Sequence, residues 1–171
     1  MASYPYRHTA YSSAARWLAV GFVAGAVSVL VFHQGAFALL HAAGLTPVAP
    51  YSVKPTAPWG LPAIWSISLW GGLWGVVMAA FMRGLARRPA ALIVASTAFG
   101  AFALSLVAWF VVDPIKGLPL AAGAVPMAMA VAMIVNGAWG FGTGAALAVF
   151  GVSRETRSRA APSHGTRAAL D

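Results

Sequence analysis

The stretch LPAIWSISLWGGLWGVVMAAFMRGLARR, residues 61–88, decides the fold class. Residues 61–82 carry no charged side chain, and Arg83, Arg87 and Arg88 follow at once. At about 1.5 Å per residue, a helix over 61–82 extends about 33 Å, slightly more than the ~30 Å hydrocarbon core of a bilayer. The stretch therefore predicts a transmembrane helix with a basic end.

Three further apolar stretches have the same character: 17–40, 89–112 and 118–152. The last is too long for one straight span, and Pro126 marks the expected start of its helix, after a bent or interfacial lead-in. Backbone polar groups find no water in lipid, so segments of this length must be helical. We expect an all-α, polytopic integral membrane protein with four transmembrane helices in a compact bundle over 17–152.

Composition supports the same class. Hydrophobic residues make up 60% of the chain, charged residues only 8%, and the mean hydropathy is +0.79. A soluble domain could not cover so much apolar surface. The net charge of +8 comes from residues that flank the apolar stretches, so we predict no nucleic-acid partner. The chain has no cysteine, which excludes disulfides and thiolate metal sites.

The basic residues predict an orientation. Lys54 and Lys116 lie in the two connections on one side of the expected bilayer. All the arginines lie on the other side: Arg7, Arg16, Arg83, Arg87, Arg88, Arg154, Arg157, Arg159 and Arg167. By the positive-inside rule, both termini are expected in the cytoplasm, and the protein in the bacterial inner membrane.

The ends are predicted to be simple. Residues 1–16 form a cytoplasmic segment, and 153–171 a flexible basic tail near anionic lipid head groups. A cleaved signal peptide is the alternative for the N-terminus, but its apolar run is longer than a typical signal sequence. Trp17, Trp59 and Trp109 stand at span ends, where indole side chains favour the membrane interface.

Small residues recur four positions apart in all four spans. This spacing places both small side chains on one helix face, so that a neighbouring backbone can approach closely. We expect these pairs to pack the helices of one chain, or, as the alternative, to form a contact with another chain. The residues are Gly21, Gly25, Gly71, Gly75, Ser96, Gly100, Gly140 and Gly144.

Spans 2 and 4 share a pattern. Leu61-Pro62 precedes Gly72-Leu73-Trp74-Gly75, and Val125-Pro126 precedes Gly137-Ala138-Trp139-Gly140 at nearly equal spacing. Two duplicated hairpins related by an axis along the membrane normal would produce this pattern. Coincidence is the alternative, because spans 1 and 3 show no clear match and these residues are common in membrane helices.

Polar side chains gather at one predicted depth, in the outward-facing third of the membrane. Helical rise brings residues from all four spans to this level. Polar groups in hydrocarbon need partners, so they would bond one another in a ring that fixes helix register, or line a pocket open to the outside. The set is His33, Gln34, Ser66, Ser68, Ser105 and Asn136.

His33 is the strongest single candidate in this layer. It is the one residue of the predicted membrane interior with a metal-capable ring nitrogen. No cofactor is predicted; a haem or pigment with His33 as ligand is an alternative, but one chain offers no second histidine at a suitable depth for a bis-histidine haem. The carboxylates Asp113, Glu155 and Asp171 lie at or beyond the membrane edges, and no catalytic motif is present, so the chain is not expected to be an enzyme.

These patterns leave three functional predictions. The first is a non-catalytic accessory or structural subunit that packs against other membrane proteins or against copies of itself. The second is a carrier or binding protein for a small solute or lipid, which uses the outward polar layer. The third is a subunit that holds a cofactor at His33.

Overall fold

The computed structural model describes residues 6–160, with side chains over 14–151. Four helical segments, which we call spans 1 to 4, are long and apolar enough to cross a membrane. They fall within a few residues of the predicted spans, so the all-α prediction is confirmed, and the four helices fit a multi-pass membrane protein. Their bounds are Ala14–Ala42, Ala63–Leu85, Pro89–Ile115 and Pro126–Gly151.

Spans 1 and 2 form the first hairpin. Span 1 consists of α1 (Tyr6–Ser28) from Ala14 onward, a π-helical segment η1 (Val29–His33) and α2 (Gln34–Ala42). Span 2 is α3 (Ala63–Met82), followed by a 3₁₀ turn η2 (Arg83–Leu85). Gly71, Gly72 and Gly75 do not break α3, because close helix contacts replace what the glycines lose in intrinsic helix propensity.

Span 3 changes its helical geometry repeatedly. It runs through α4 (Pro89–Ala98), η3 (Phe99–Leu104), α5 (Ser105–Val107), η4 (Ala108–Val112) and α6 (Asp113–Ile115). Both η3 and η4 are π-helical. A π turn inserts an extra residue into an α-helix, which widens it locally.

Span 4 begins where the proline predicts. A 3₁₀ segment, η5 (Leu120–Ala124), precedes α7 (Pro126–Ala160), and the last four η5 residues have positive φ angles in the left-handed region. The bent lead-in before Pro126 is therefore confirmed. In the connection between spans 1 and 2, β1 (Pro55–Thr56) pairs antiparallel with β2 (Leu61–Pro62).

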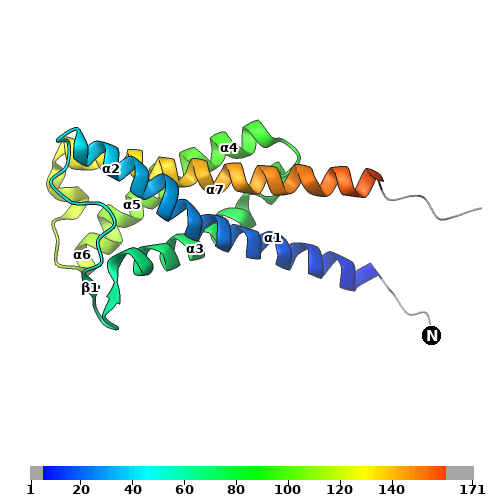
Figure 1. Cartoon of the computed structure of the whole chain (residues 1–171), viewed down its shortest axis with the longest axis horizontal. Coiled ribbons are helices and arrows are strands. Elements are labelled where there is room, and N and C mark those ends of the chain that lie inside the picture. Colours follow the sequence, from blue (N-terminus) through cyan, green and yellow to red (C-terminus); the bar gives the residue numbers. More distant parts are fainter. Residues whose placement is uncertain (1–5, 161–171) are drawn as a thin grey trace, which may run out of the picture.

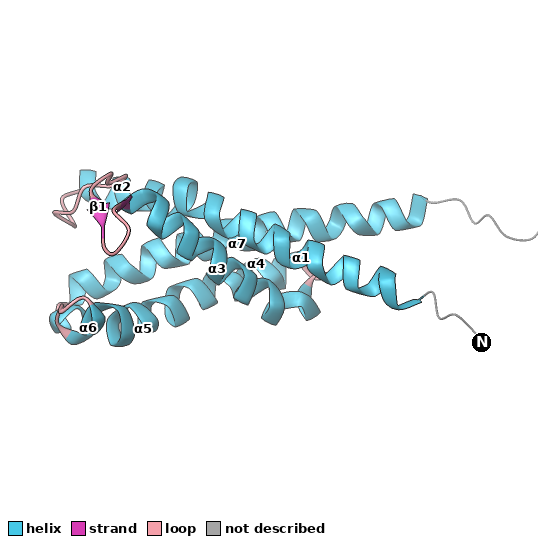
Figure 2. Ribbon diagram, turned by 90° about the horizontal axis from the view of Figure 1, so that it is seen from below, coloured by secondary structure: helices cyan, strands magenta, loops and turns pink. Residues whose placement is uncertain are grey.

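The four spans give the bundle two distinct ends (Figures 1 and 2). At the termini end lie the start of α1, the end of α7 and the 83–88 turn; α1 and α7 both extend past this turn. At the loop end lie the 43–62 connection with β1 and β2, and the 116–125 connection. The two hairpins thus run in the same direction.

The helices α1 and α7 extend into the two predicted flanks, 1–16 and 153–171. α1 already begins at Tyr6, and α7 continues through 153–160, the first part of the predicted flexible tail. Alanine, arginine and glutamate in this stretch are good helix formers, and they extend a helix that the span has already nucleated. Residues 1–5 and 161–171 lie outside the described residues.

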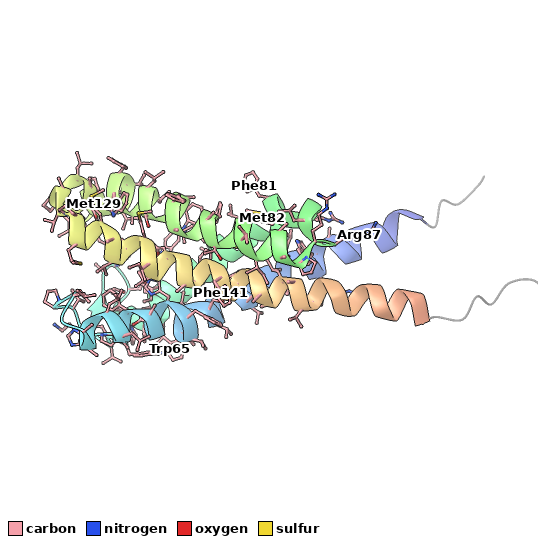
Figure 3. The ribbon with its side chains drawn as sticks, turned by 90° about the horizontal axis from the view of Figure 1, so that it is seen from above. Trp65, Phe81, Met82, Arg87, Met129 and Phe141 are labelled. Carbon is pink, nitrogen blue, oxygen red and sulfur yellow. The ribbon has the colours of Figure 1, made fainter. Side chains whose placement is uncertain are left out.

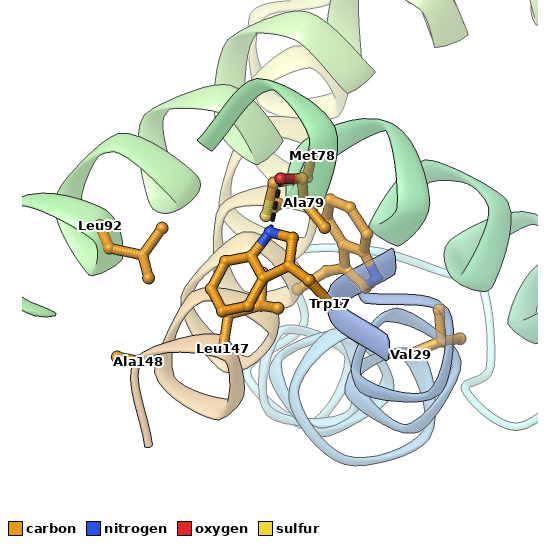
Figure 4. Packing of buried hydrophobic residues seen from close by; sticks show 8 residues of the cluster. Trp17, Val29, Met78, Ala79, Leu92, Leu147 and Ala148 are labelled. Atoms are coloured by element: carbon orange, nitrogen blue, oxygen red, sulfur yellow. Dashed lines mark hydrogen bonds between the residues drawn. The ribbon is translucent and has the colours of Figure 1, made fainter. Parts of the chain in front are cut away.

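The tightest core lies toward the termini end, where all four spans contribute buried side chains. Trp17 of α1, Met78 of α3, Leu92 of α4 and Leu147 of α7 belong to one cluster (Figure 4). Trp17 is only 3% exposed, and its Nε1 donates a hydrogen bond of 2.7 Å to the carbonyl oxygen of Ala79. The side chain of Trp17 therefore points into the bundle rather than toward its outer surface, and the indole N–H has its partner there.

The outer surface of the spans is apolar. Phe81, Val94 and Val149 are 77%, 69% and 68% exposed, and Phe81 points away from the bundle (Figure 3). A surface this rich in exposed apolar side chains would be a liability in water and suits contact with lipid. Trp59, in the loop-end connection, is 81% exposed, whereas Trp109 is buried in span 3.

Within each hairpin, the predicted small pairs bring two backbones together. A Cβ atom added to Gly25 or to Gly75 would collide with the carbonyl oxygen of Gly71 or Gly21, respectively. All eight predicted packing residues line such contacts within the chain: Gly21, Gly25, Gly71 and Gly75 in the first-hairpin interface, and Ser96, Gly100, Gly140 and Gly144 in the second-hairpin interface.

The two interfaces repeat the same contacts. Gly25 faces the carbonyl of Gly71 and the Cα of Gly75. In the second hairpin, Gly100 faces the carbonyl of Asn136 and the Cα of Gly140 in the same way. Residues of spans 1 and 3 correspond at a separation of 75 positions, and those of spans 2 and 4 at 65. The matched geometry supports the duplicated-hairpin interpretation and defines the correspondence that spans 1 and 3 alone do not reveal.

Candidate functional site

A cavity of about 180 Å³ lies between the two hairpins. All four spans contribute to its wall, in the half of the bundle nearer the loop end. The lining residues are Val29 and His33 of span 1; Ile67, Trp70, Gly71 and Trp74 of span 2; Leu104, Val107, Ala108 and Val112 of span 3; and Asn136 and Trp139 of span 4.

The cavity lies at the junction of the two repeated hairpins. Eight of its lining residues form four corresponding pairs under the separations of 75 and 65 positions. These pairs are Val29 with Leu104, His33 with Ala108, Gly71 with Asn136, and Trp74 with Trp139. The first and last pairs join residues of the same chemical type. In the two middle pairs only one member, His33 or Asn136, has a polar side chain. The site is therefore geometrically repeated but chemically asymmetric.

Two polar side chains face this cavity. The Nδ2 atom of Asn136 donates to the Ser105 hydroxyl oxygen at 3.1 Å, which links spans 4 and 3. His33 Nδ1 lies 3.4 Å from the Gln34 amide nitrogen, and its ring stacks on Phe37 at 6.3 Å between centroids. These contacts leave the second side-chain N–H and the side-chain oxygen of Asn136, and His33 Nε2, without a partner among the side chains described over 14–151. Donors and acceptors are thus available to a ligand.

Tryptophans supply the flat apolar walls. Trp139 is 1% exposed, and its Nε1 donates to the Gly25 carbonyl oxygen at 2.8 Å, so the ring is fixed in place. Trp74 lies 6.2 Å from Phe99, between ring centroids, across the same junction. Trp70 lines the cavity and is still 59% exposed, so the cavity reaches the outer surface of the spans there. Access from a surrounding membrane would pass this side chain.

The π-helical segments make room for the cavity. Val29 and His33 are the first and last residues of η1, while Ala108 and Val112 bound η4. The wider π turn moves neighbouring side chains out of α-helical register, and such turns are frequent at functional sites. Neither segment is apparent from hydropathy, since lipid and protein interior select the same apolar residues.

The predicted polar layer does not form one connected ring. Only Asn136 and Ser105 bond to each other across spans. Ser68 donates to the Ile64 carbonyl of its own helix at 2.7 Å, and the Gln34 side-chain oxygen accepts from the backbone N–H of Tyr51 in the loop at 2.7 Å. Ser66 is half-buried and lines no part of the cavity. Within the layer, His33 and Asn136 therefore face the cavity, Ser105 holds Asn136, and Gln34 and Ser68 bond to nearby backbone.

The cavity size limits the cofactors that fit. A cavity of about 150 Å³ holds one benzene ring, so about 180 Å³ accommodates a single six-membered ring with small substituents. A porphyrin carries four pyrrole rings and does not fit beside His33 in this arrangement. Among the side chains described over 14–151, no three His, Cys, Asp or Glu residues lie together as a metal site.

Part of this site is absent from the sequence predictions. Trp74, Leu104 and Ala108 line the cavity, but nothing in their local sequence indicates it. The shared Gly-x-Trp-Gly pattern of spans 2 and 4 is the usable signal, because it relates Trp74 to Trp139.

Comparison of the chain with protein-family models, with curated proteins and with solved structures finds no match.

Proposed function

We propose that the protein is a multi-pass protein of a bacterial inner membrane that binds a small, flat, lipid-soluble molecule in the cavity between its hairpins. In this placement both termini are cytoplasmic. Arg16, Arg83, Arg87 and Arg88 belong to the termini end, whereas Lys54 and Lys116 belong to the loop end. The positive-inside rule supports this orientation.

One observation carries the binding proposal: His33 and Asn136 face a ring-sized cavity that is walled by Trp74 and Trp139. Aromatic walls favour a flat ring, and the amide and imidazole groups suit carbonyl or hydroxyl substituents. The cavity opens beside the exposed Trp70, on the surface that would contact lipid. The ligand would therefore enter from the membrane, in which it is dissolved. A quinone-like ring has this combination of shape, polarity and solubility.

The accessory-subunit prediction stays a prediction from the sequence. Its main support was the four small-residue pairs, and all eight of their residues make close contacts within one chain. Lipid and ligand binding need no further protein surface. The binding role is therefore the better supported of the two.

The test uses duroquinone, a single-ring quinone whose ring carbons are all substituted. Purified protein in nanodiscs is titrated while tryptophan fluorescence and the unfolding temperature, Tm, are followed. We expect saturable quenching and a rise in Tm, both lost in His33→Leu and Asn136→Leu, because these changes remove the polar partners. His41→Leu is the matched control, since His41 bonds the Thr46 carbonyl at 2.9 Å outside the cavity.

Quenching by quinones dissolved in lipid is linear and independent of the protein site. Linear quenching that is equal in all four proteins, without any rise in Tm, would reject the binding proposal for this ligand class.

A further inference from the structure

A second hollow lies between α1 and α7, away from the hairpin cavity. It measures about 530 Å³ and includes residues of both helices. Phe150 and Ala146 of α7 form one wall, and Val20, Val23 and Val27 of α1 form the other, with Arg16 at the end nearer the terminus. We call this the α1–α7 groove.

The geometry points to the α1–α7 groove as the binding site of an anionic phospholipid, with its phosphate at Arg16 and an acyl chain along the valines. This inference rests on the proposed membrane placement but not on the ligand of the hairpin cavity. It assigns the groove to the leaflet at the termini end.

The chemistry of the lining fits one amphipathic occupant. Every lining side chain except that of Arg16 is apolar, and Val23 and Val27 are 60% and 50% exposed. Arg16 is exposed, and a guanidinium binds a phosphate with two parallel hydrogen bonds. A wholly apolar occupant would leave this cation without a complement.

The length of the groove fits one leaflet. From Arg16 to Val27 the helix rises about 16 Å, which is close to half of the ~30 Å hydrocarbon core. A phosphate at Arg16 thus places the end of an acyl chain near the level of Val27, at the bilayer midplane. A lipid standing upright in its own leaflet therefore occupies the groove without bending.

The far wall of the groove is held in a fixed position. Phe150 lies 6.2 Å from Trp17 between ring centroids, and Trp17 in turn is tied to the Ala79 carbonyl. Because Trp17 belongs to the buried core, the groove is a preformed feature of the packed bundle. A preformed groove retains a bound lipid through purification better than a flat surface does.

The experiment measures lipid retention by native mass spectrometry. The full-length protein is stripped of lipid in detergent and incubated with phosphatidylglycerol or with phosphatidylcholine of the same chain length. We expect one phosphatidylglycerol per chain, bound about fivefold more weakly in Arg16→Gln. Arg83→Gln is the matched control: it removes an exposed arginine of the same end that does not line the groove.

A second variant tests the acyl chain. Ala19 is exposed and lines the groove, so Ala19→Phe fills it without entering the core. It should displace phosphatidylglycerol while leaving the Tm of the stripped protein unchanged. Three results would overturn the inference: equal retention of both lipids, equal loss in Arg16→Gln and Arg83→Gln, or a dimer of the chain that Ala19→Phe dissociates.

Discussion

Trp139 in span 4 donates its indole N–H to the carbonyl oxygen of Gly25 in span 1, at 2.8 Å. These residues are 114 positions apart, and the bond joins the second hairpin to the first beside the cavity. The nearby approach of Gly25 to Gly71 and Gly75 supplies the backbone that the indole reaches. Packing within one hairpin and contact between hairpins are thus coupled at this point.

Removing that bond should loosen the bundle. Trp139→Phe keeps an aromatic ring but loses the N–H donor and part of the buried volume. We expect a loss of about 1–3 kcal/mol in the free energy of unfolding, from the hydrogen bond together with a small cavity. Trp65→Phe is the control, because Trp65 is 59% exposed. Equal effects of the two changes on Tm in detergent would argue against a special role for Trp139.

A single methyl group should separate the helices of the first hairpin. A Cβ at Gly75 meets the Gly21 carbonyl, which belongs to a rigid backbone, so Gly75→Ala forces the helices apart. Such overpacking typically costs about 1–3 kcal/mol. Gly35 lies in α2 with no heavy atom within 4 Å of its added Cβ, so Gly35→Ala should be neutral or slightly stabilising. A Gly75→Ala protein with wild-type Tm would contradict the described contact.

The repeated interfaces predict a rescue. In the first hairpin Gly21 of span 1 faces the Cβ of Ala79 in span 2. At the corresponding contact of the second hairpin, span 3 carries the larger residue, Ser96, and span 4 carries the glycine, Gly144. Gly144→Ala alone should destabilise the protein, since the two Cβ atoms cannot share this space. Adding Ser96→Gly should restore most of the Tm by reproducing the arrangement at Gly21. Additive losses in the double variant would count against the correspondence of the two hairpins.

The sequence predicts where each helix lies along its axis better than how the helix is rotated about that axis. Charge-free length and Pro126 predict all four spans within a few residues, because bilayer thickness and proline geometry act along the helix axis. Rotation about that axis is not predictable in the same way, because lipid and protein core both accept apolar residues. For this reason the depth of Ser68 says nothing about its bonding partner. The burial of Trp17 was missed for the same reason.

The site was predicted in part. His33 and Asn136 stand out as polar residues in an apolar context, and the structure brings both to one cavity. The place of Trp74 opposite Trp139 follows from the hairpin repeat, which the Gly-x-Trp-Gly pattern of spans 2 and 4 suggests and the matched backbone contacts of Gly25 and Gly100 support. Local sequence contains no record of such distant contacts.

The loop-end connection should depend on Gln34. Its side-chain oxygen accepts from the Tyr51 backbone N–H at 2.7 Å, while the Tyr51 hydroxyl donates to the Leu30 carbonyl at 3.0 Å. Gln34→Leu should accelerate amide hydrogen exchange in the connection by up to about tenfold, the equivalent of one hydrogen bond. Tyr51→Phe, which loses only the hydroxyl bond, should have a smaller effect at the Tyr51 amide. Exchange unchanged in Gln34→Leu would show that other contacts fix the connection.

The most direct test of the proposed site uses the absence of cysteine from the chain. Ala108→Cys places one thiol in the cavity wall, at the position that corresponds to His33 of the first hairpin. Val111→Cys is the control, because Val111 belongs to the same π-helical segment but is 49% exposed on the outer surface. The rate of reaction with N-ethylmaleimide is measured in nanodiscs with and without duroquinone. The account predicts that duroquinone slows the reaction of Ala108→Cys at least severalfold and leaves Val111→Cys unchanged. Equal rates for Ala108→Cys with and without the quinone would contradict it.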